Sequence, residues 1–84
     1  MDIKLEFCVV WNYTPRAVST IEDILEKYGN TVKSINLIPS GGGVFEFQLN
    51  EKLLFSKKEL GRHSEDGEIL KLIEEELGWV SRLI

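Results

Sequence analysis

The sequence predicts a two-layer α/β fold, in which two helices cover one face of a four-stranded mixed sheet. Two observations lead to this prediction. Apolar and polar residues alternate as in strands at 2–10 and 44–49, and apolar stripes with helical spacing occupy 15–28 and 65–77. Each predicted strand also has one polar side, so both helices are expected on the same, apolar face of the sheet.

The first strand is predicted at residues 2–10, because its apolar residues alternate with Lys4 and Glu6. Its apolar members are Ile3, Leu5, Phe7 and Val9. By the same alternation Cys8 falls on the polar face, which predicts a partly exposed thiol.

A helix is predicted to follow, with Thr14 as its N-cap and Pro15 at its first position, where a missing N–H does no harm. Gly29 and Asn30 are expected to end it, because both tolerate the left-handed conformation of a helix C-terminus. Its buried stripe is expected to consist of Ala17, Val18, Ile21, Ile24, Leu25 and Tyr28.

Three further strands are predicted at 31–38, 44–49 and 52–56, with a tight turn at Asn50-Glu51 between the last two. A basic loop is expected next, followed by a second helix that Ser64 caps. Gly78 should end that helix, with Trp79 folded back on its last turn. The residues that this helix should bury are Ile69, Leu70, Ile73 and Leu77.

The order of the predicted elements is β-α-β-β-β-α. A right-handed crossover makes the first two strands parallel, and the hairpin adds two antiparallel strands. This is the layout of a minimal thioredoxin-like domain, and other two-layer α/β sandwiches share the same element order.

The composition indicates one globular domain over residues 1–84. Residues 1–6 alternate like a strand and do not resemble a signal peptide, and no apolar stretch is long enough to span a membrane. The formal net charge of −4 argues against nucleic acid as a partner. The single cysteine excludes an intrachain disulfide and favours the reducing cytoplasm.

Three segments of the chain carry a family resemblance. Residues 7–17 read Phe-Cys-Val-Val-Trp-Asn-Tyr-Thr-Pro-Arg-Ala, which resembles a strand ending in Cys-x-x-Cys or Cys-x-x-selenocysteine before a helix that opens with Tyr-x-x-Arg-Ala. Residues 42–47, Gly-Gly-Val-Phe-Glu-Phe, and residues 50–62, with Ser-Lys-Lys and Gly-Arg, follow in the matching order. Together they resemble the selenoprotein W, T and H-related (Rdx) family over about residues 2–77, which leaves an apolar tail at 79–84.

The resemblance implies a thioredoxin-like fold, a role in cell redox homeostasis, and exchange with glutathione or protein thiols at the Cys-x-x-Cys loop. This chain departs from the pattern at Trp11, which occupies the second redox position. Dithiol exchange needs a second thiol to resolve the mixed disulfide, and Cys8 is the only cysteine. Dithiol oxidoreductase activity is therefore not expected, whereas a monothiol reaction with glutathione as co-substrate is compatible with the sequence.

Cys8 is accordingly the candidate catalytic residue, and its neighbours in the motif are Val9, Val10, Trp11 and Tyr13. Cys8 is either a reactive monothiol or an inert remnant of the ancestral site. Trp11 either fills space in the loop or serves as an exposed anchor for a protein partner.

Arg16, Lys57 and Lys58 are candidate contacts for an anion such as glutathione. A backbone contact is the alternative for Arg16, which is poorly placed for the dipole in the first turn of a helix. His63 and Ser64 replace the Phe-Pro of relatives, a change expected to alter only the entry to the last helix.

The loop Gly41-Gly42-Gly43 lacks the Lys-Ser/Thr of a phosphate-binding loop. In a thioredoxin-like fold it is expected to face the redox motif. No metal site or resident cofactor is expected, because one cysteine and one histidine are too few ligands for zinc.

The leading hypothesis is a cytoplasmic, selenoprotein W-like protein that forms a glutathione adduct or another mixed disulfide at Cys8. The rival hypothesis is a non-catalytic protein-binding module that kept the fold and lost the dithiol chemistry. The tail at 79–84 is expected to cover the core or to mediate a homodimer, and a Cys8–Cys8 disulfide would be a second route to that homodimer.

Overall fold

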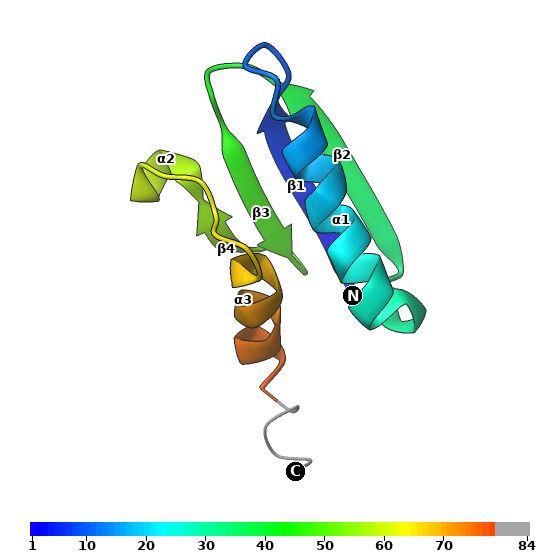
Figure 1. Ribbon diagram of the computed structural model, residues 1–84. Helices are drawn as coiled ribbons and strands as arrows, with labels where there is room; N and C mark the ends of the chain where they lie inside the picture. Colours follow the sequence, from blue (N-terminus) through cyan, green and yellow to red (C-terminus); the bar gives the residue numbers. More distant parts are fainter. Residues whose placement is uncertain (79–84) are drawn as a thin grey trace.

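The computed structural model describes residues 1–78 and has the expected α/β architecture (Figure 1). The tail at 79–84, including Trp79, lies outside the described residues. In chain order the elements are β1 (Asp2–Cys8), α1 (Thr14–Tyr28), the 3₁₀ turn η1 (Gly29–Thr31), β2 (Ser34–Ser40), β3 (Phe45–Leu49), β4 (Lys52–Ser56), α2 (Lys57–Leu60) and α3 (Glu68–Leu77). No helix within residues 1–78 is long and apolar enough to cross a membrane.

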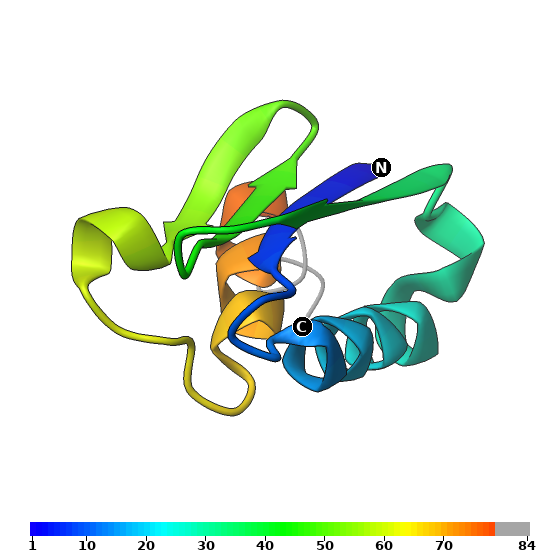
Figure 2. The same cartoon turned by 90° about the horizontal axis from the view of Figure 1, so that it is seen from above.

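The four strands form one mixed sheet in the order β2-β1-β3-β4. β1 pairs with β2 in parallel and with β3 antiparallel, and β3 pairs antiparallel with β4. Both long helices lie on the same face of the sheet, with α1 beside β1 and β2 and α3 beside β3 and β4 (Figure 2). The predicted topology is therefore confirmed.

The core fills the space between the sheet and the two long helices. Strands β1 and β3 contribute through alternate residues, and α1 and α3 contribute one stripe each. Its buried members are Ile3, Leu5, Phe7, Ala17, Ile21, Ile24, Tyr28, Phe45, Phe47, Leu49, Phe55, Ile69 and Ile73.

The ends of α1 differ from the prediction. The helix begins at Thr14, the N-cap position belongs to Tyr13, and no side chain caps this end. Pro15 still lies in the first turn, where its missing N–H is tolerated. At the other end Gly29 has φ −42°, so the chain continues into η1 instead of stopping in the left-handed region.

The buried stripe of α1 is narrower than predicted, because Val18 and Leu25 are each 45% exposed. Each follows a buried residue directly, which places it roughly 100° round the helix from the stripe that contacts the sheet. A two-layer fold has no third element to cover that flank. The expectation that both residues are buried was wrong.

β2 also lies later in the chain than predicted, and it includes Pro39, which the sequence placed in a loop. The strand accepts a proline because it is at the edge of the sheet, where one side of its backbone needs no partner. The turn Asn50-Glu51 is confirmed, with φ values of 49° and 70° that suit a tight hairpin.

The segment after β4 was predicted as a basic loop, but it contains the short helix α2. The Ser56 side chain accepts a hydrogen bond from the Glu59 backbone N–H at 3.1 Å. The pattern Ser-x-x-Glu at 56–59 is the signal of this helix start, and Gly61, with φ 73°, ends the helix. The predicted cap of the last helix was wrong, because α3 begins at Glu68 with Gly67 at its N-cap position. Gly78 ends α3 as predicted, with φ 67°.

Candidate functional site

Cys8 is the last residue of β1, and its side chain is fully buried, with 0% of its surface exposed. The predicted partial exposure was wrong. Alternation along a strand gives no information about what covers the strand end, and here the following loop turns back over it. The Tyr13 N–H donates to the Cys8 carbonyl at 3.0 Å, and the Asn12 N–H donates to the Val9 carbonyl at 3.1 Å.

The sulfur of Cys8 accepts a hydrogen bond from the backbone N–H of Trp11, with a nitrogen–sulfur distance of 3.3 Å. Asn12 makes the tight turn with φ 61°, a conformation that Asn tolerates better than most residues. Cys8 is not a member of the packed apolar cluster between the sheet and the helices. The thiol therefore lies under the loop, and the loop backbone is bonded to it.

The tip of this loop is apolar and exposed. Val9, Val10 and Trp11 are 45%, 76% and 60% exposed, respectively. Val9 was predicted to face the core within a strand at 2–10, but β1 ends at Cys8, two residues before the predicted end, and the alternation stops there. We call residues 9–11 the apolar tip.

Trp11 is exposed on one side only, because its indole lies against the backbone of Gly43. A Cβ atom on Gly43 would lie 2.6 Å from Cζ3 of Trp11, and the φ angle of Gly43 is +72°. A Cβ on Gly41 or Gly42 would meet no atom within 4 Å. Of the three glycines expected to face the motif, only Gly43 touches Trp11 in this way.

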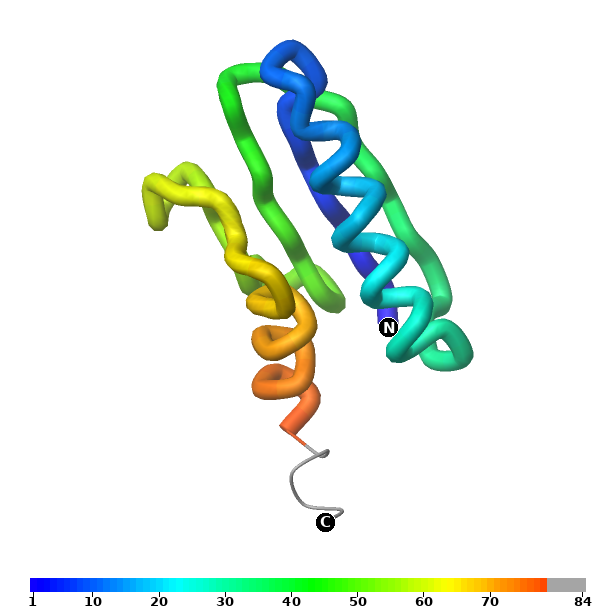
Figure 3. Tube along the Cα trace, in the orientation of Figure 1, coloured from blue at the N-terminus to red at the C-terminus, as the bar shows by residue number. Residues whose placement is uncertain are grey.

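The glycine segment and the loop at 9–13 lie at the same end of the sheet (Figure 3). Two backbone hydrogen bonds hold them there. The Cys8 N–H donates to the Val44 carbonyl at 2.9 Å, and the Val9 N–H donates to the Ser40 carbonyl at 3.0 Å. Cys8, the last residue of β1, and Val9, the residue after it, thus anchor both ends of the glycine segment.

Behind Trp11 lies a row of aromatic rings that includes His63. The ring centroids of Trp11 and Tyr13 are 6.3 Å apart, those of Tyr13 and His63 are 4.3 Å apart, and those of His63 and Phe45 are 5.7 Å apart. All three pairs meet edge to face, the arrangement that aromatic rings favour. His63 therefore connects the loop at 9–13 to the sheet.

Nδ1 of His63 is buried and has no hydrogen-bond partner among the described residues. Burial lowers the pKa of His63, and the charges of Arg16 and Lys57 lower it further. The sequence assigned His63 no metal-binding role and predicted only that it alters the entry to the last helix. No local pattern indicated its packing role, which depends on the approach of three separate segments.

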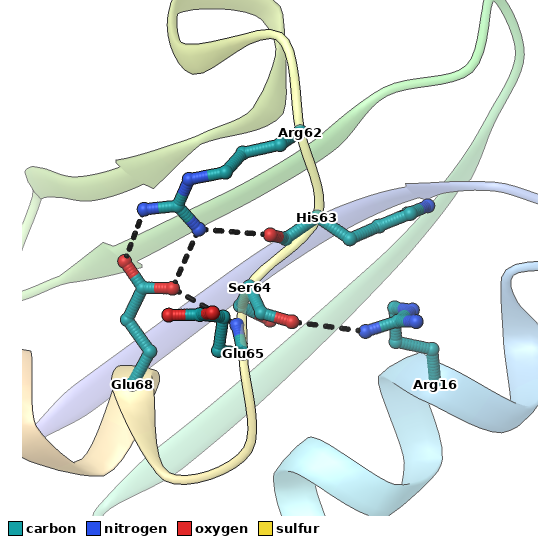
Figure 4. Close-up of polar contacts among 6 residues, drawn as sticks. All are labelled: Arg16, Arg62, His63, Ser64, Glu65 and Glu68. Atoms are coloured by element: carbon teal, nitrogen blue, oxygen red, sulfur yellow. Dashed lines mark hydrogen bonds and ion pairs between the residues drawn. The ribbon is translucent and has the colours of Figure 1, made fainter.

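The segment from 61 to 67 is held by Arg62, whose guanidinium makes two bonds to the Glu68 carboxylate (Figure 4). The nitrogen–oxygen distances are 2.8 and 2.9 Å. The Glu65 N–H also donates to Glu68, at 2.9 Å. Bonds from Arg62 and from the Glu65 amide lower the pKa of Glu68 to about 2.

The contacts that Arg16, Lys57 and Lys58 make among the described residues are with groups other than the Cys8 sulfur. Arg16 donates to the Ser64 carbonyl at 3.1 Å, which is the backbone contact that the sequence left open (Figure 4). The Lys57 ammonium lies 5.8 Å from the centroid of the Tyr13 ring, and the Lys58 backbone N–H donates to Glu46 at 3.2 Å. Within residues 1–78 no group of three or more His, Cys, Asp or Glu side chains could hold a metal ion.

The sheet order, the two helices on one face and the cysteine at the end of the central parallel strand define a thioredoxin-like domain. A profile of the Rdx family matches residues 2–75, and this chain belongs to that family.

Two solved structures share the fold. A selenoprotein W-related protein from Vibrio cholerae superposes with a TM-score of 0.81 at 20% identity, over 88% of this chain and 92% of the other. A protein from Bordetella parapertussis gives a TM-score of 0.82 at 21% identity, over 89% of this chain and 95% of the other. No curated protein sequence matches the chain significantly.

Proposed function

We propose that this protein is a non-catalytic binding module of the cytoplasm that docks on a protein partner through the apolar tip, residues 9–11. The observation that carries the proposal is the difference in solvent exposure between Cys8 and Trp11. The Cys8 side chain is 0% exposed, whereas Trp11, three residues later, is 60% exposed. A nucleophile must reach its target, and the residue that reaches the surface here is the tryptophan.

The apolar tip has the properties of a binding anchor. Tryptophan is enriched among the residues that dominate binding energy in protein interfaces. The loop is also held in place before binding, by its bonds to Cys8 and by the packing of Trp11 on Gly43. A preformed loop loses little conformational entropy on association, which favours affinity.

The test is affinity for a partner that is isolated with the wild-type protein and then purified. Trp11→Ala should weaken binding by about tenfold or more while the melting temperature changes little. Leu60→Ala is the matched control, because Leu60 is also an exposed apolar residue, on α2. Equal affinity of wild type and Trp11→Ala would refute docking through the apolar tip.

A monothiol reaction is the second candidate, and the hydrogen bond from the Trp11 N–H to the Cys8 sulfur favours it. A backbone N–H aimed at sulfur can stabilise negative charge there. The Cys8 thiolate would attack the disulfide of oxidised glutathione, form a mixed disulfide and release one glutathione thiolate, which takes up a proton. A second glutathione thiolate would then attack the mixed disulfide, regenerate Cys8 and release oxidised glutathione.

This reaction requires the loop at 9–13 to open, because the sulfur is covered. Intact mass after treatment with oxidised glutathione distinguishes the two candidates. An adduct that forms on the native protein as fast as on the unfolded protein would support the monothiol reaction. An adduct confined to the unfolded protein would leave the binding module as the function.

A further inference from the structure

The two loops at the Trp11 end of the sheet contain no charged side chain. Residues 7–15 include the apolar tip and residues 39–45 include the glycine segment, and neither stretch contains Asp, Glu, Lys or Arg. The chain as a whole has a formal net charge of −4. The electrostatic character of this end of the molecule therefore depends on charged side chains that reach it from other elements.

Lys57, the first residue of α2, brings a positive charge to the apolar tip. Its ammonium lies 5.8 Å from the centroid of the Tyr13 ring, and the centroids of the Tyr13 and Trp11 rings are 6.3 Å apart. An aromatic ring attracts an ammonium but leaves its N–H groups free for other acceptors. Within residues 1–78 Lys57 forms no ion pair, and its ammonium donates no hydrogen bond.

Arg16 adds a second positive charge from the side of α1. Burial lowers the pKa of His63, and the charges of Arg16 and Lys57 lower it further, so both cations act on the ring that packs on Tyr13. Figure 4 shows Arg16 reaching from α1 toward the segment of His63. The first turn of α1 has no acidic residue and no side-chain cap, so the positive end of the helix dipole adds to these charges.

The acidic residues of the neighbouring strands and of α2 point to other sides. Glu46 alternates with two core phenylalanines, so its carboxylate lies on the face of the sheet away from the helices. There it accepts a hydrogen bond from the Lys58 backbone N–H at 3.2 Å, and Glu6 lies opposite it on the same face. Glu59 follows Lys57 by two residues, roughly 200° round the helix.

Arg16 has acidic neighbours on the side of α3. It borders a pocket between α1 and the start of α3, together with Asp23, Glu65 and Asp66. These carboxylates reduce the positive potential of Arg16 on that side. Lys57 is therefore the principal cation at the apolar tip, and Arg16 supports it from behind the Tyr13 ring.

We propose that the partner of the apolar tip presents an acidic residue beside an apolar one, and that Lys57 binds the acidic residue while Trp11 binds the apolar one. This inference rests on the proposed docking through the apolar tip. Neither ring contact between Trp11 and Lys57 is longer than 6.3 Å. An extended peptide rises ~3.3 Å per residue, so the two residues of the partner should lie about four positions apart or fewer.

A protein segment suits this surface better than a membrane or a nucleic acid. Anionic lipids and phosphate backbones attract proteins through clusters of several cations, whereas this end of an acidic chain offers Lys57 with Arg16 behind it. One carboxylate is the counterpart of one ammonium. Apolar contact at Trp11 would exclude water beside that ion pair, which strengthens it.

The first test is selection of short peptides from a random display library on the immobilised full chain. We expect the peptides that the wild type selects to contain Asp or Glu within about four positions of an aromatic or aliphatic residue. Trp11→Ala should select none of them, and Lys57→Glu should select peptides with basic residues in place of the acidic ones. Lys33→Glu is the matched control, because Lys33 is exposed at the opposite end of the sheet, next to Met1.

Titration of a selected peptide gives the size of the effect. Lys57→Glu should raise its Kd about fivefold or more, because repulsion replaces attraction in a partly exposed pair. Lys33→Glu makes the same change in net charge and should alter the Kd by less than about twofold, since salt screens distant charges. Added salt should weaken binding to the wild type more than binding to Lys57→Gln.

The outcomes separate this inference from the proposed function. Peptides that need Trp11 but show no excess of acidic residues would overturn the inference and leave docking through the apolar tip intact. If no selected peptide needs Trp11, both are overturned. Binding to vesicles of phosphatidylcholine and phosphatidylserine that Trp11→Ala and Lys57→Glu both abolish would assign the surface to a membrane and would also overturn the inference.

Discussion

The indole of Trp11 lies on the bare backbone of Gly43, so closely that a single methyl group on Gly43 would displace it. The Cβ of an alanine would lie 2.6 Å from Cζ3 and 2.9 Å from Cε3 of the indole. Trp11 replaces a redox residue of the family pattern, and the space it occupies depends on a residue far along the chain.

Gly43→Ala should move Trp11 and destabilise the fold by about 1–3 kcal/mol, because it combines a clash with an unfavourable φ angle. Gly42→Ala has the strained φ of +69° without the clash, and Gly41→Ala has neither. The free energy of unfolding should therefore decrease in the order Gly41→Ala, Gly42→Ala, Gly43→Ala. The indole N–H resonance of Trp11 should shift strongly only in Gly43→Ala, and an unshifted resonance there would contradict this packing.

Asn12 holds the loop closed over Cys8 with a φ angle of 61°. Asn12→Gly should keep this turn, because glycine adopts positive φ freely. Asn12→Val should loosen it, at a penalty of about 1–2 kcal/mol for a left-handed residue with a Cβ. The quantity to measure is the rate at which iodoacetamide alkylates Cys8 in the native protein. That rate should rise in Asn12→Val and stay low in Asn12→Gly, and equal rates would mean that the turn does not control access to the thiol.

The Arg62–Glu68 pair should make stability depend on pH in the acid range. The pKa of Glu68 falls from 4.5 to about 2 in the folded protein, so its contribution is present above pH 4.5 and disappears as pH falls toward 2. Both side chains are partly exposed, so solvent screening keeps the contribution small. Glu68→Gln should therefore lower the free energy of unfolding at pH 7 and have little effect near pH 2. Glu75→Gln, on the exposed side of α3, is the control and should show no such difference.

His63 should produce a second pH dependence, at higher pH. Its folded pKa lies below the ordinary 6.5, so the unfolded chain binds the proton more readily. Stability should therefore fall as pH drops below about 6.5 and level off below the folded pKa of His63. His63→Phe keeps the ring contacts with Tyr13 and Phe45 and removes the unbonded Nδ1, so it should unfold no more easily at pH 7 and lack this dependence. His63→Ala loses ring pairs worth about 0.5–1.5 kcal/mol each. An unchanged pH profile in His63→Phe would mean that His63 does not cause the effect.

The sequence predicted the order of the four strands and the two long helices, the sheet topology and the Asn50-Glu51 turn, because those features follow from local periodicity and turn chemistry. It did not predict the short helix α2 or the 3₁₀ turn η1. It did not predict the burial of Cys8, since alternation indicates the face of a strand but not whether a loop folds over it. Ser64 looked like a cap, yet the Arg62–Glu68 pair and Gly67 set the start of α3. The ring contacts of His63 join segments far apart in the chain, and no local pattern signals such contacts.

Cys8 and Val9 anchor the glycine segment from both sides, since one donates its N–H to Val44 and the other to Ser40. An insertion or deletion within 41–43 would have to preserve both hydrogen bonds and the packing of the Trp11 indole on Gly43. The segment is rich in glycine, yet its length is fixed by the hydrogen bonds at its two ends. Homologous chains that retain tryptophan at this position should therefore vary in the composition of this segment before they vary in its length.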